Sequence, residues 1–252
     1  MNKILDYFDS SLLLLLIFFN YFSYFILDTK SYFIFFTFIT LLTFFIILYK
    51  NLKINLYIII IILLMALISL GSPVSDWDGR SIWLFNAKRI FYNHNLSEYI
   101  NYLGSEFSHL DYPILIQTLS ASLATLIGKW NEIFPKFSSI IFALPALLII
   151  SKIIKNNLDK LILMILVFFI YEKKLINGEM DALLSLYAIS CVILLINFFK
   201  LKKVYSKDYL ELFLFIASLT MIKTEGIGIF LCLFISYLII YFFRCSFFFL
   251  FL

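Results

Sequence analysis

Long apolar runs separated by short polar turns make up almost the whole chain. Such runs predict membrane-crossing helices when they approach the length that spans about 30 Å of hydrocarbon. The runs of this length are 11–27, 31–49, 54–70, 137–154, 181–199 and 224–243. Two shorter runs, 159–171 and 209–222, cross only if flanking residues contribute. The pattern therefore predicts an all-α fold, a polytopic transmembrane helical bundle.

Composition excludes other broad classes. Of the 252 residues, 63% are hydrophobic and only 14% are charged, and the mean hydropathy is +1.00, which argues against a soluble globular protein. We interpret the first run as a retained span, because Asp6 and Asp9 accompany Lys3 and no small-residue cleavage site follows. The three cysteines lie in apolar runs, without the spacing of a zinc site or a disulfide framework. The net charge of +4 is spread over many short loops, so we expect no nucleic-acid partner.

Lysine and arginine positions set the expected orientation, because cationic loops stay cytoplasmic. The turn from Lys50 to Lys53 places the N-terminus in the cytoplasm, and it places Gly71 onward on the outer face of an inner or plasma membrane. If residues 112–128 crossed the bilayer, eight downstream cations would face outward, whereas all eight are cytoplasmic if the segment lies in the outer interface. We expect the second arrangement, which the serines, threonines and glutamine of the segment also favour.

This orientation divides the chain into three parts. Residues 1–70 hold three transmembrane helices, 71–136 form a periplasmic loop with amphipathic interfacial helices, and 137–252 hold about five further transmembrane helices. The chain stops within an apolar run, so we expect it to be truncated. The outer face collects irregular, aromatic and acidic residues, which predicts a site there. Its acids are Asp76, Asp78, Glu98, Glu106, Asp111, Glu132, Glu172, Glu179, Asp181 and Glu225.

The outer loop begins with WDGRSIWLFNAKRIF, a stretch with helical periodicity. Apolar residues recur at Trp83, Ala87, Ile90 and Phe91. Polar residues occupy the other faces at Arg80, Asn86, Lys88 and Arg89. We expect a short amphipathic helix on the outer surface that begins at Asp78. Asp78 either caps this helix or acts chemically, and Asp76 is an alternative cap or metal ligand.

Further along the loop, Asp111 precedes the pair Tyr112 and Pro113, which favours an extended residue followed by a helix start. Helix-capping chemistry alone explains that acid. We interpret His109 as a solvated loop residue, because no second histidine stands at metal-binding spacing.

Acids also stand at the head of the span that begins near residue 181. Glu179 and Asp181 there complement the positive end of the helix dipole. An aspartate leading into a span is nevertheless costly unless it stays hydrated or has a partner, so a functional role competes. Lys223 and Glu225 lie at the outer junction between the last two spans.

Together these residues suit a reaction between a membrane-borne donor and an acceptor at the outer interface. Such a reaction needs a carboxylate to deprotonate the acceptor, and cations or a metal to hold a phosphate leaving group. The runs WDGRSIWLFNAKRIF, HLDYPILIQTLSA, GEMDALLSLYAI and IKTEGIGIF resemble those of the integral-membrane C-type glycosyltransferases that use polyprenyl-phosphate sugars. Relatives in that superfamily include the protein O-mannosyltransferases and the lipid A aminoarabinose transferase. The resemblance covers roughly residues 70–235, in the same order.

The resemblance implies an enzyme, a hexosyl or pentosyl transferase of the cell envelope that moves a sugar to an acceptor hydroxyl with inversion. Asp78 matches the loop acid, a general base, and Asp181 matches a second acid for acceptor positioning or metal binding. Lys88 matches a lysine that faces the donor phosphate. The implied substrate-binding residues are Lys88, Arg80, Asp111, Tyr112, Lys223 and Glu225. The resemblance also implies a divalent metal ion of unknown identity as a cofactor. Its implied partners are the bilayer and a missing C-terminal segment or partner subunit.

Two other classes compete with this interpretation. A lipid or small-anion transporter or flippase would place ionisable residues near the middle of its spans, with glycine or proline breaks there. The spans of this chain lack central charges, which favours interfacial chemistry. The second competing class is an inactive membrane fragment, which would retain only the sequence signals for membrane insertion.

Overall fold

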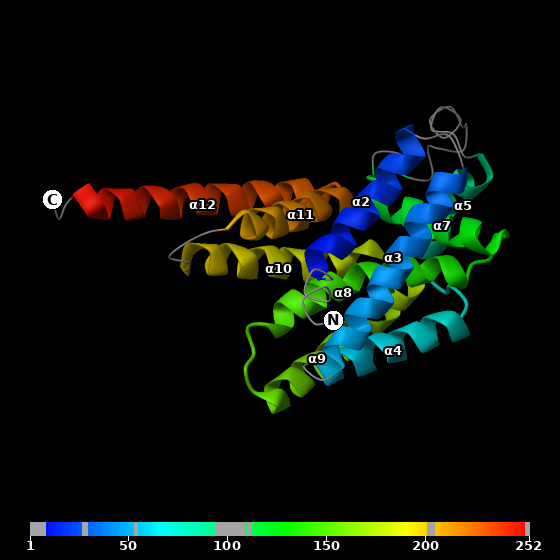
Figure 1. Ribbon diagram of the computed structural model, residues 1–252, viewed down its shortest axis with the longest axis horizontal. Coiled ribbons are helices and arrows are strands. Elements are labelled where there is room, and N and C mark those ends of the chain that lie inside the picture. Colours follow the sequence, from blue (N-terminus) through cyan, green and yellow to red (C-terminus); the bar gives the residue numbers. More distant parts are fainter. Residues whose placement is uncertain are drawn as a thin grey trace.

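The computed structural model describes residues 9–26, 30–52, 55–93, 109, 112–200 and 205–249 (Figure 1). Within these ranges the chain forms helices and no strands, as the apolar runs predict. The α-helices are α2 (Ser10–Ile26), α3 (Lys30–Asn51), α4 (Leu56–Gly71), α5 (Leu84–Asn93), α7 (Leu115–Ile127), α8 (Phe137–Ser151), α9 (Asn157–Asn177), α10 (Met180–Lys200), α11 (Ser206–Ile222) and α12 (Glu225–Phe249). A π-helix, η1 (Gly79–Trp83), precedes α5, and a 3-10 turn, η3 (Phe134–Lys136), precedes α8.

Each predicted span corresponds to a helix. The largest difference is in α9, which extends the predicted run 159–171 to Asn157–Asn177. Its added C-terminal turn contains lysines and a glutamate, which interrupt the apolar run but are good helix formers. The helix ends where Gly178 adopts a left-handed φ of 79°.

Within the described part of the chain, three helical segments are long and apolar enough to cross a membrane: Phe33–Asn51, Phe134–Ser151 and Met180–Lys200. The first and third are half-buried or less within the protein, whereas 94% of the second is buried. The second segment is therefore enclosed by other helices and forms the centre of the fold. Figure 1 shows α10, α11 and α12 running roughly along the long axis of the molecule, while α2 and α3 cross it steeply.

Every residue of α8 is buried, and polar contacts fix it against its neighbours. Pro145 lies inside α8 and has no N–H to donate to the preceding turn. Beside it, the buried Tyr187 hydroxyl of α10 donates to the Phe142 carbonyl at 2.8 Å. The Tyr187 ring stacks on Phe142, with ring centroids 4.6 Å apart, and contacts Phe215 of α11 at 5.3 Å. These contacts join α8, α10 and α11 into one core.

The segment expected in the outer interface is surrounded by protein over most of its length. All residues from Leu115 to Thr125 of α7 are buried, and apolar surface is exposed only in its last turn, at Ile127. Its 13 residues span only about 20 Å, which is too short to cross a membrane. Burial of its hydroxyls is tolerated because Thr118 and Ser120 donate to carbonyls one turn back, and Ser120 also contacts the Ser138 hydroxyl at 2.7 Å.

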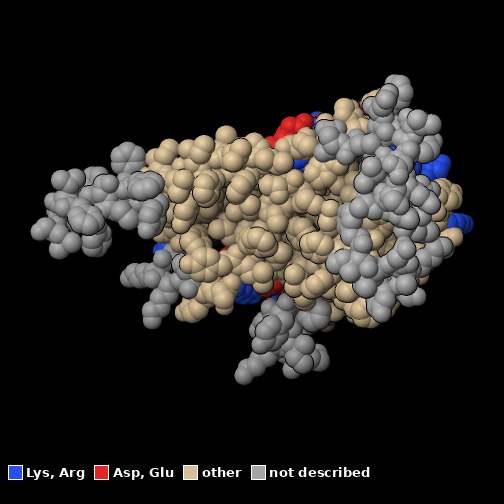
Figure 2. All heavy atoms as spheres, turned by 90° about the horizontal axis from the view of Figure 1, so that it is seen from above, with Lys and Arg blue, Asp and Glu red and all other residues tan. Residues whose placement is uncertain are grey.

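The helix ends fall into two groups, because successive helices run back and forth. At one end, Asp9 before α2 pairs with Lys207 of α11 at 2.7 Å, and Lys152 after α8 pairs with Glu211 at 3.3 Å. We call this the paired end. The opposite end contains the segment 72–78, the α9–α10 turn and the α11–α12 turn, and we call it the cluster end. Residues without charge dominate the face of the molecule shown in Figure 2, where the visible charged side chains lie mainly toward its edges.

Candidate functional site

The segment after α4 is docked onto the α9–α10 turn. The Asn177 amide at the end of α9 is buried and donates to the Ser75 hydroxyl at 3.0 Å and to the Asp76 carboxylate. Gly79 packs directly against the Asn177 carbonyl, and a Cβ at this position would overlap that oxygen. Only glycine therefore permits this approach of η1 to α9.

A second contact holds the start of the same segment. Lys136 of η3 is fully buried, and its ammonium donates to the Ser72 carbonyl at 2.6 Å. Contacts at both ends thus position the segment that carries Asp76 and Asp78.

Asp76 also forms a carboxyl pair with Glu179, which follows the left-handed Gly178. Burial raises the pKa of Glu179, and a hydrogen bond to the Asp76 carboxylate together with that group's negative charge raises it further. Lys174 lies 3.9 Å from Glu179 and opposes the shift without cancelling it. The protonated Glu179 side chain can therefore donate to Asp76, and the pair can store a proton.

Asp181 of α10 lies in an adjoining ion-pair network. Its carboxylate contacts the Lys223 ammonium at 2.9 Å and the Lys174 ammonium at 3.5 Å. Lys223 also contacts Glu225 at 3.4 Å. Burial lowers the pKa of Lys223, but the hydrogen bond to Asp181 and the charges of both acids outweigh it, so the net pKa is raised. The ammonium therefore stays charged, with only 18% of its side chain exposed.

Aromatic rings lie next to this ammonium. Tyr112 stacks on His109 and on Trp83, with centroid distances of 4.9 and 5.3 Å and interplanar angles of 13° and 6°. Lys223 lies 5.5 Å from the centroid of the Tyr112 ring, within the range of a cation–π contact. The rings connect the loop, η1 and the α11–α12 turn. They form an apolar wall beside the Lys223 ammonium, which Asp181 and Glu225 contact.

The residues expected at the site divide into three groups. Asp181, Tyr112, Lys223 and Glu225 come together at the cluster end. Asp78, Arg80 and Lys88 are exposed, and the described residues include no ion pair or side-chain hydrogen bond for any of the three. Asp111 lies outside the described residues.

Asp78 stands at the entry to η1, as predicted, but two finer expectations are wrong. Trp77 and Asp78 are themselves helical, and the Arg80 amide bonds to the Asp76 carbonyl at 3.2 Å. Asp78 makes no capping hydrogen bond, because the chain coils through it into the wider π-helix. The polar faces are also not uniformly exposed, since Asn86 and Arg89 are buried where α5 packs against α7.

Asn177 and Lys174 are members of the cluster that the sequence pattern did not single out. Asn177 and Gly178 together form a turn-prone pair at the end of α9, and this is the signal that marks the position. Nothing in the local sequence indicates that the amide bonds across to Asp76, 101 residues away.

The described residues do not fit a preformed metal site. No three or more His, Cys, Asp or Glu side chains among them are arranged to hold an ion. Asp76 and Glu179 provide two carboxyl groups, and a shared hydrogen bond joins them. The reaction proposed for this chain therefore has no step assigned to a metal.

Comparison with known proteins adds no family assignment. No protein-family model matches this chain, and neither the curated proteins nor the solved structures contain a significant match to it.

Proposed function

We propose that this chain is a membrane glycosyltransferase that moves a sugar from a polyprenyl-phosphate donor to an acceptor hydroxyl at the periplasmic face. One observation supports the proposal most strongly. The acidic segment 72–78, the α11–α12 turn with its lysine, and stacked aromatic rings all lie at one end of an apolar helical protein. A lipid-linked phosphate is expected at such a boundary, because its chain needs apolar surroundings and its phosphate needs cations.

In the proposed reaction, the acceptor oxygen attacks the anomeric carbon as its proton passes to a carboxylate. The new C–O bond forms as the bond between the anomeric carbon and the phosphate oxygen breaks. The electron pair of that bond leaves with the polyprenyl phosphate, and the configuration at carbon inverts because the acceptor attacks the face opposite the leaving group. Tyr112 lies beside the Lys223 ammonium and keeps part of its side chain exposed, so its edge would contact the sugar.

The geometry favours different tasks for the two expected catalytic acids. Asp78 is exposed, and its carboxylate makes no ion pair or hydrogen bond among the described residues that would compete with a proton, so it suits the general base. Asp181 contacts two ammonium groups and is better suited to orienting them. Lys223 and Lys174 would then face the phosphate, where positive charge stabilises the leaving group.

Release of polyprenyl phosphate tests this proposal whatever the acceptor is, because transfer to any hydroxyl frees the same lipid phosphate. Membranes containing the full chain would be given a panel of short polyprenyl-phosphate sugars, and the released lipid phosphate would be measured by chromatography. We expect release with at least one sugar, and its loss in Asp78→Asn at an unchanged protein level. If no sugar gives release above that of membranes without the protein, the proposed activity is wrong.

A further inference from the structure

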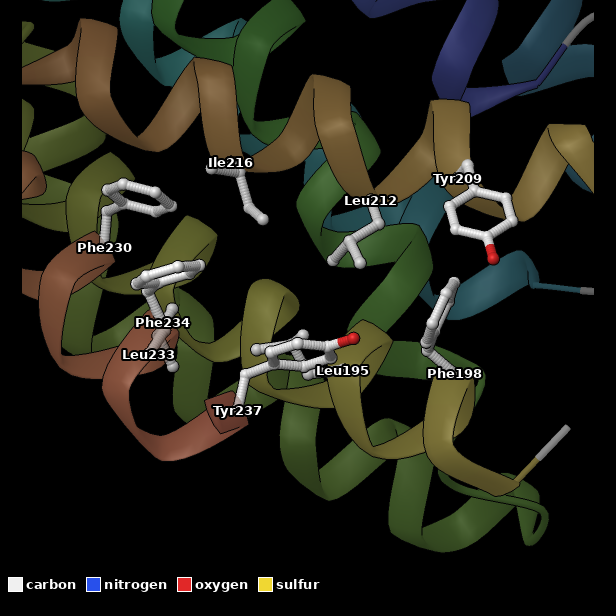
Figure 3. A pocket seen from close by; sticks show the side chains of 9 residues that line it. All are labelled: Leu195, Phe198, Tyr209, Leu212, Ile216, Phe230, Leu233, Phe234 and Tyr237. Atoms are coloured by element: carbon white, nitrogen blue, oxygen red, sulfur yellow. The ribbon is translucent and has the colours of Figure 1, made fainter. Parts of the chain in front are cut away.

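A second site lies away from the cluster end, between α10, α11 and α12. Nine side chains from these helices converge there on an apolar slot of about 210 Å³ (Figure 3). They include Phe198 of α10, Leu212 of α11, and Phe230, Leu233 and Phe234 of α12. Figure 3 shows that the side chains leave open space between the three helices.

The slot is accessible from the side of the protein. Phe234 is 47% exposed and Tyr209 is 58% exposed, although both line it. Such large apolar groups around an open space favour an apolar ligand that enters from a bilayer.

A charged hollow adjoins the slot. It has a volume of about 350 Å³, lies between α8, α10 and α11, and shares the lining residues Phe198 and Leu212 with the slot. Its volume falls within the range of about 300–1,000 Å³ that is common for small-molecule sites. The two spaces together can accept one amphiphile, with its chain in the slot and its polar group in the hollow.

The charges of the hollow define that polar group. Lys152 and Lys200 supply two ammonium groups, and Asp208 and Glu211 supply two carboxylates. Lys152 contacts Glu211 at 3.3 Å but is 56% exposed, so it keeps donors free. Lys200 has no ion-pair partner among the described residues. A phosphate would satisfy these lysines, and an ammonium beside it would satisfy the carboxylates.

We propose that the slot and the hollow together bind one zwitterionic glycerophospholipid, with a phosphoethanolamine-type headgroup in the hollow and an acyl chain in the slot. Glu211 already pairs with Lys152, so a phosphate that binds this lysine draws charge away from the carboxylates of Glu211 and Asp208. An anionic headgroup without an ammonium would not replace that charge. The bound chain fills the gap along α12 and so stabilises the packing of this helix on α10 and α11. The site is independent of the proposed transfer reaction, since it lies near the paired end and shares no residue with the cluster.

Native mass spectrometry of the full chain, released from detergent with equal amounts of phosphatidylethanolamine and phosphatidylglycerol, tests this site. We expect one phosphatidylethanolamine to be retained in preference to phosphatidylglycerol. Lys200→Gln should weaken retention about tenfold, because it removes a charge-assisted contact. The matched control Lys155→Gln changes an exposed lysine outside the hollow and should retain the lipid.

The apolar slot is tested by a pair of substitutions on α12. Leu233→Trp fills the slot and should reduce lipid retention, whereas Leu231→Trp, at a residue that is 50% exposed and does not line the slot, should not. Glu211→Gln should reduce the preference for ethanolamine over glycerol.

Preferred retention of phosphatidylglycerol, or equal retention by Lys200→Gln and the unchanged protein, would overturn the proposal. Displacement of the lipid signal by inorganic phosphate alone would overturn it as well, because the acyl chain would then contribute nothing. If Leu233→Trp fails to fold, the lysine pair still decides between these outcomes.

Discussion

The two ends of the helical protein use charge differently. At the paired end, the ion pairs within the described residues are separate contacts between helix ends, as in Asp9 with Lys207 and Lys152 with Glu211. The lysines there are 64% and 56% exposed. At the cluster end, Lys223 is 18% exposed and is shared between Asp181 and Glu225. Ion pairs with such exposed lysines contribute little to stability, so the pairs at the paired end mainly bring neighbouring helix ends together.

The cluster end also has more acids than cations. Four acids, Asp76, Glu179, Asp181 and Glu225, share the contacts of two lysines, Lys174 and Lys223, among the described residues. Lys136 adds a third cation, bound to the Ser72 carbonyl. Burial and the Asp76 carboxylate raise the pKa of Glu179, the direction that reduces this negative charge. Charge that is crowded rather than neutralised is more typical of functional sites than of structural ion pairs. The contrast therefore supports placing the proposed reaction at the cluster end.

The largest expected effect is at Asp78. Asp78→Asn should lower polyprenyl-phosphate release about 10²–10⁴-fold, because the acceptor loses its base. Asp159→Asn, at an exposed acid in the first turn of α9 near the paired end, is the matched control and should retain full release. Equal release by the two variants would remove Asp78 from the mechanism.

Lys223→Gln should lower release by about 10²-fold, since it removes the enclosed positive charge proposed to face the leaving phosphate. Lys207→Gln removes an ion-paired lysine at the paired end and should not affect release. If both variants behave alike, the difference between the ends has no functional meaning.

Gly79→Ala should destabilise the protein by about 1–3 kcal/mol, because its Cβ would overlap the Asn177 carbonyl. Gly71→Ala serves as the control, since a Cβ there meets nothing within 4 Å. Thermal unfolding in detergent measures the difference. An unchanged midpoint in Gly79→Ala would show that the loop is not docked as described.

Glu179 makes a pH-dependent contribution at the cluster end. Its folded pKa is raised above the ordinary value of 4.5, so the folded state binds more protons in the interval between the ordinary and the raised value. Stability should therefore decrease as pH rises through that interval. Glu179→Gln should reduce this slope in melts measured from pH 4 upward, and an identical slope in both proteins would contradict the carboxyl pair.

The smallest effect is expected for the ion pair of Asp9 and Lys207. Asp9→Asn should change stability by no more than about 1 kcal/mol, because its partner Lys207 is 64% exposed. A larger loss, measured by the same thermal unfolding, would show that the paired end holds the helices together more strongly than its exposure indicates.

Sequence periodicity was sufficient to predict the helices, because runs of apolar residues allow few alternatives. The expected orientation also assigned Asp181 and Lys223 to one side of the membrane, and the structure brings these two into contact. The environment of α7 was not predictable, since the same serines and threonines suit an interface or a buried helix whose hydroxyls bond to its own carbonyls. The role of Asn177 depends on packing between distant segments, which periodicity does not encode.

The central claim is that the loop acid and the later acidic span face the same side of the membrane. Single cysteines at Arg80, Glu225, Lys155 and Tyr205, in a chain without Cys191, Cys232 and Cys245, would be labelled in intact cells with an impermeant maleimide. All four positions are exposed on the protein. We predict labelling of positions 80 and 225 from outside, and labelling of 155 and 205 only after permeabilisation. Opposite behaviour of positions 80 and 225 would contradict the site.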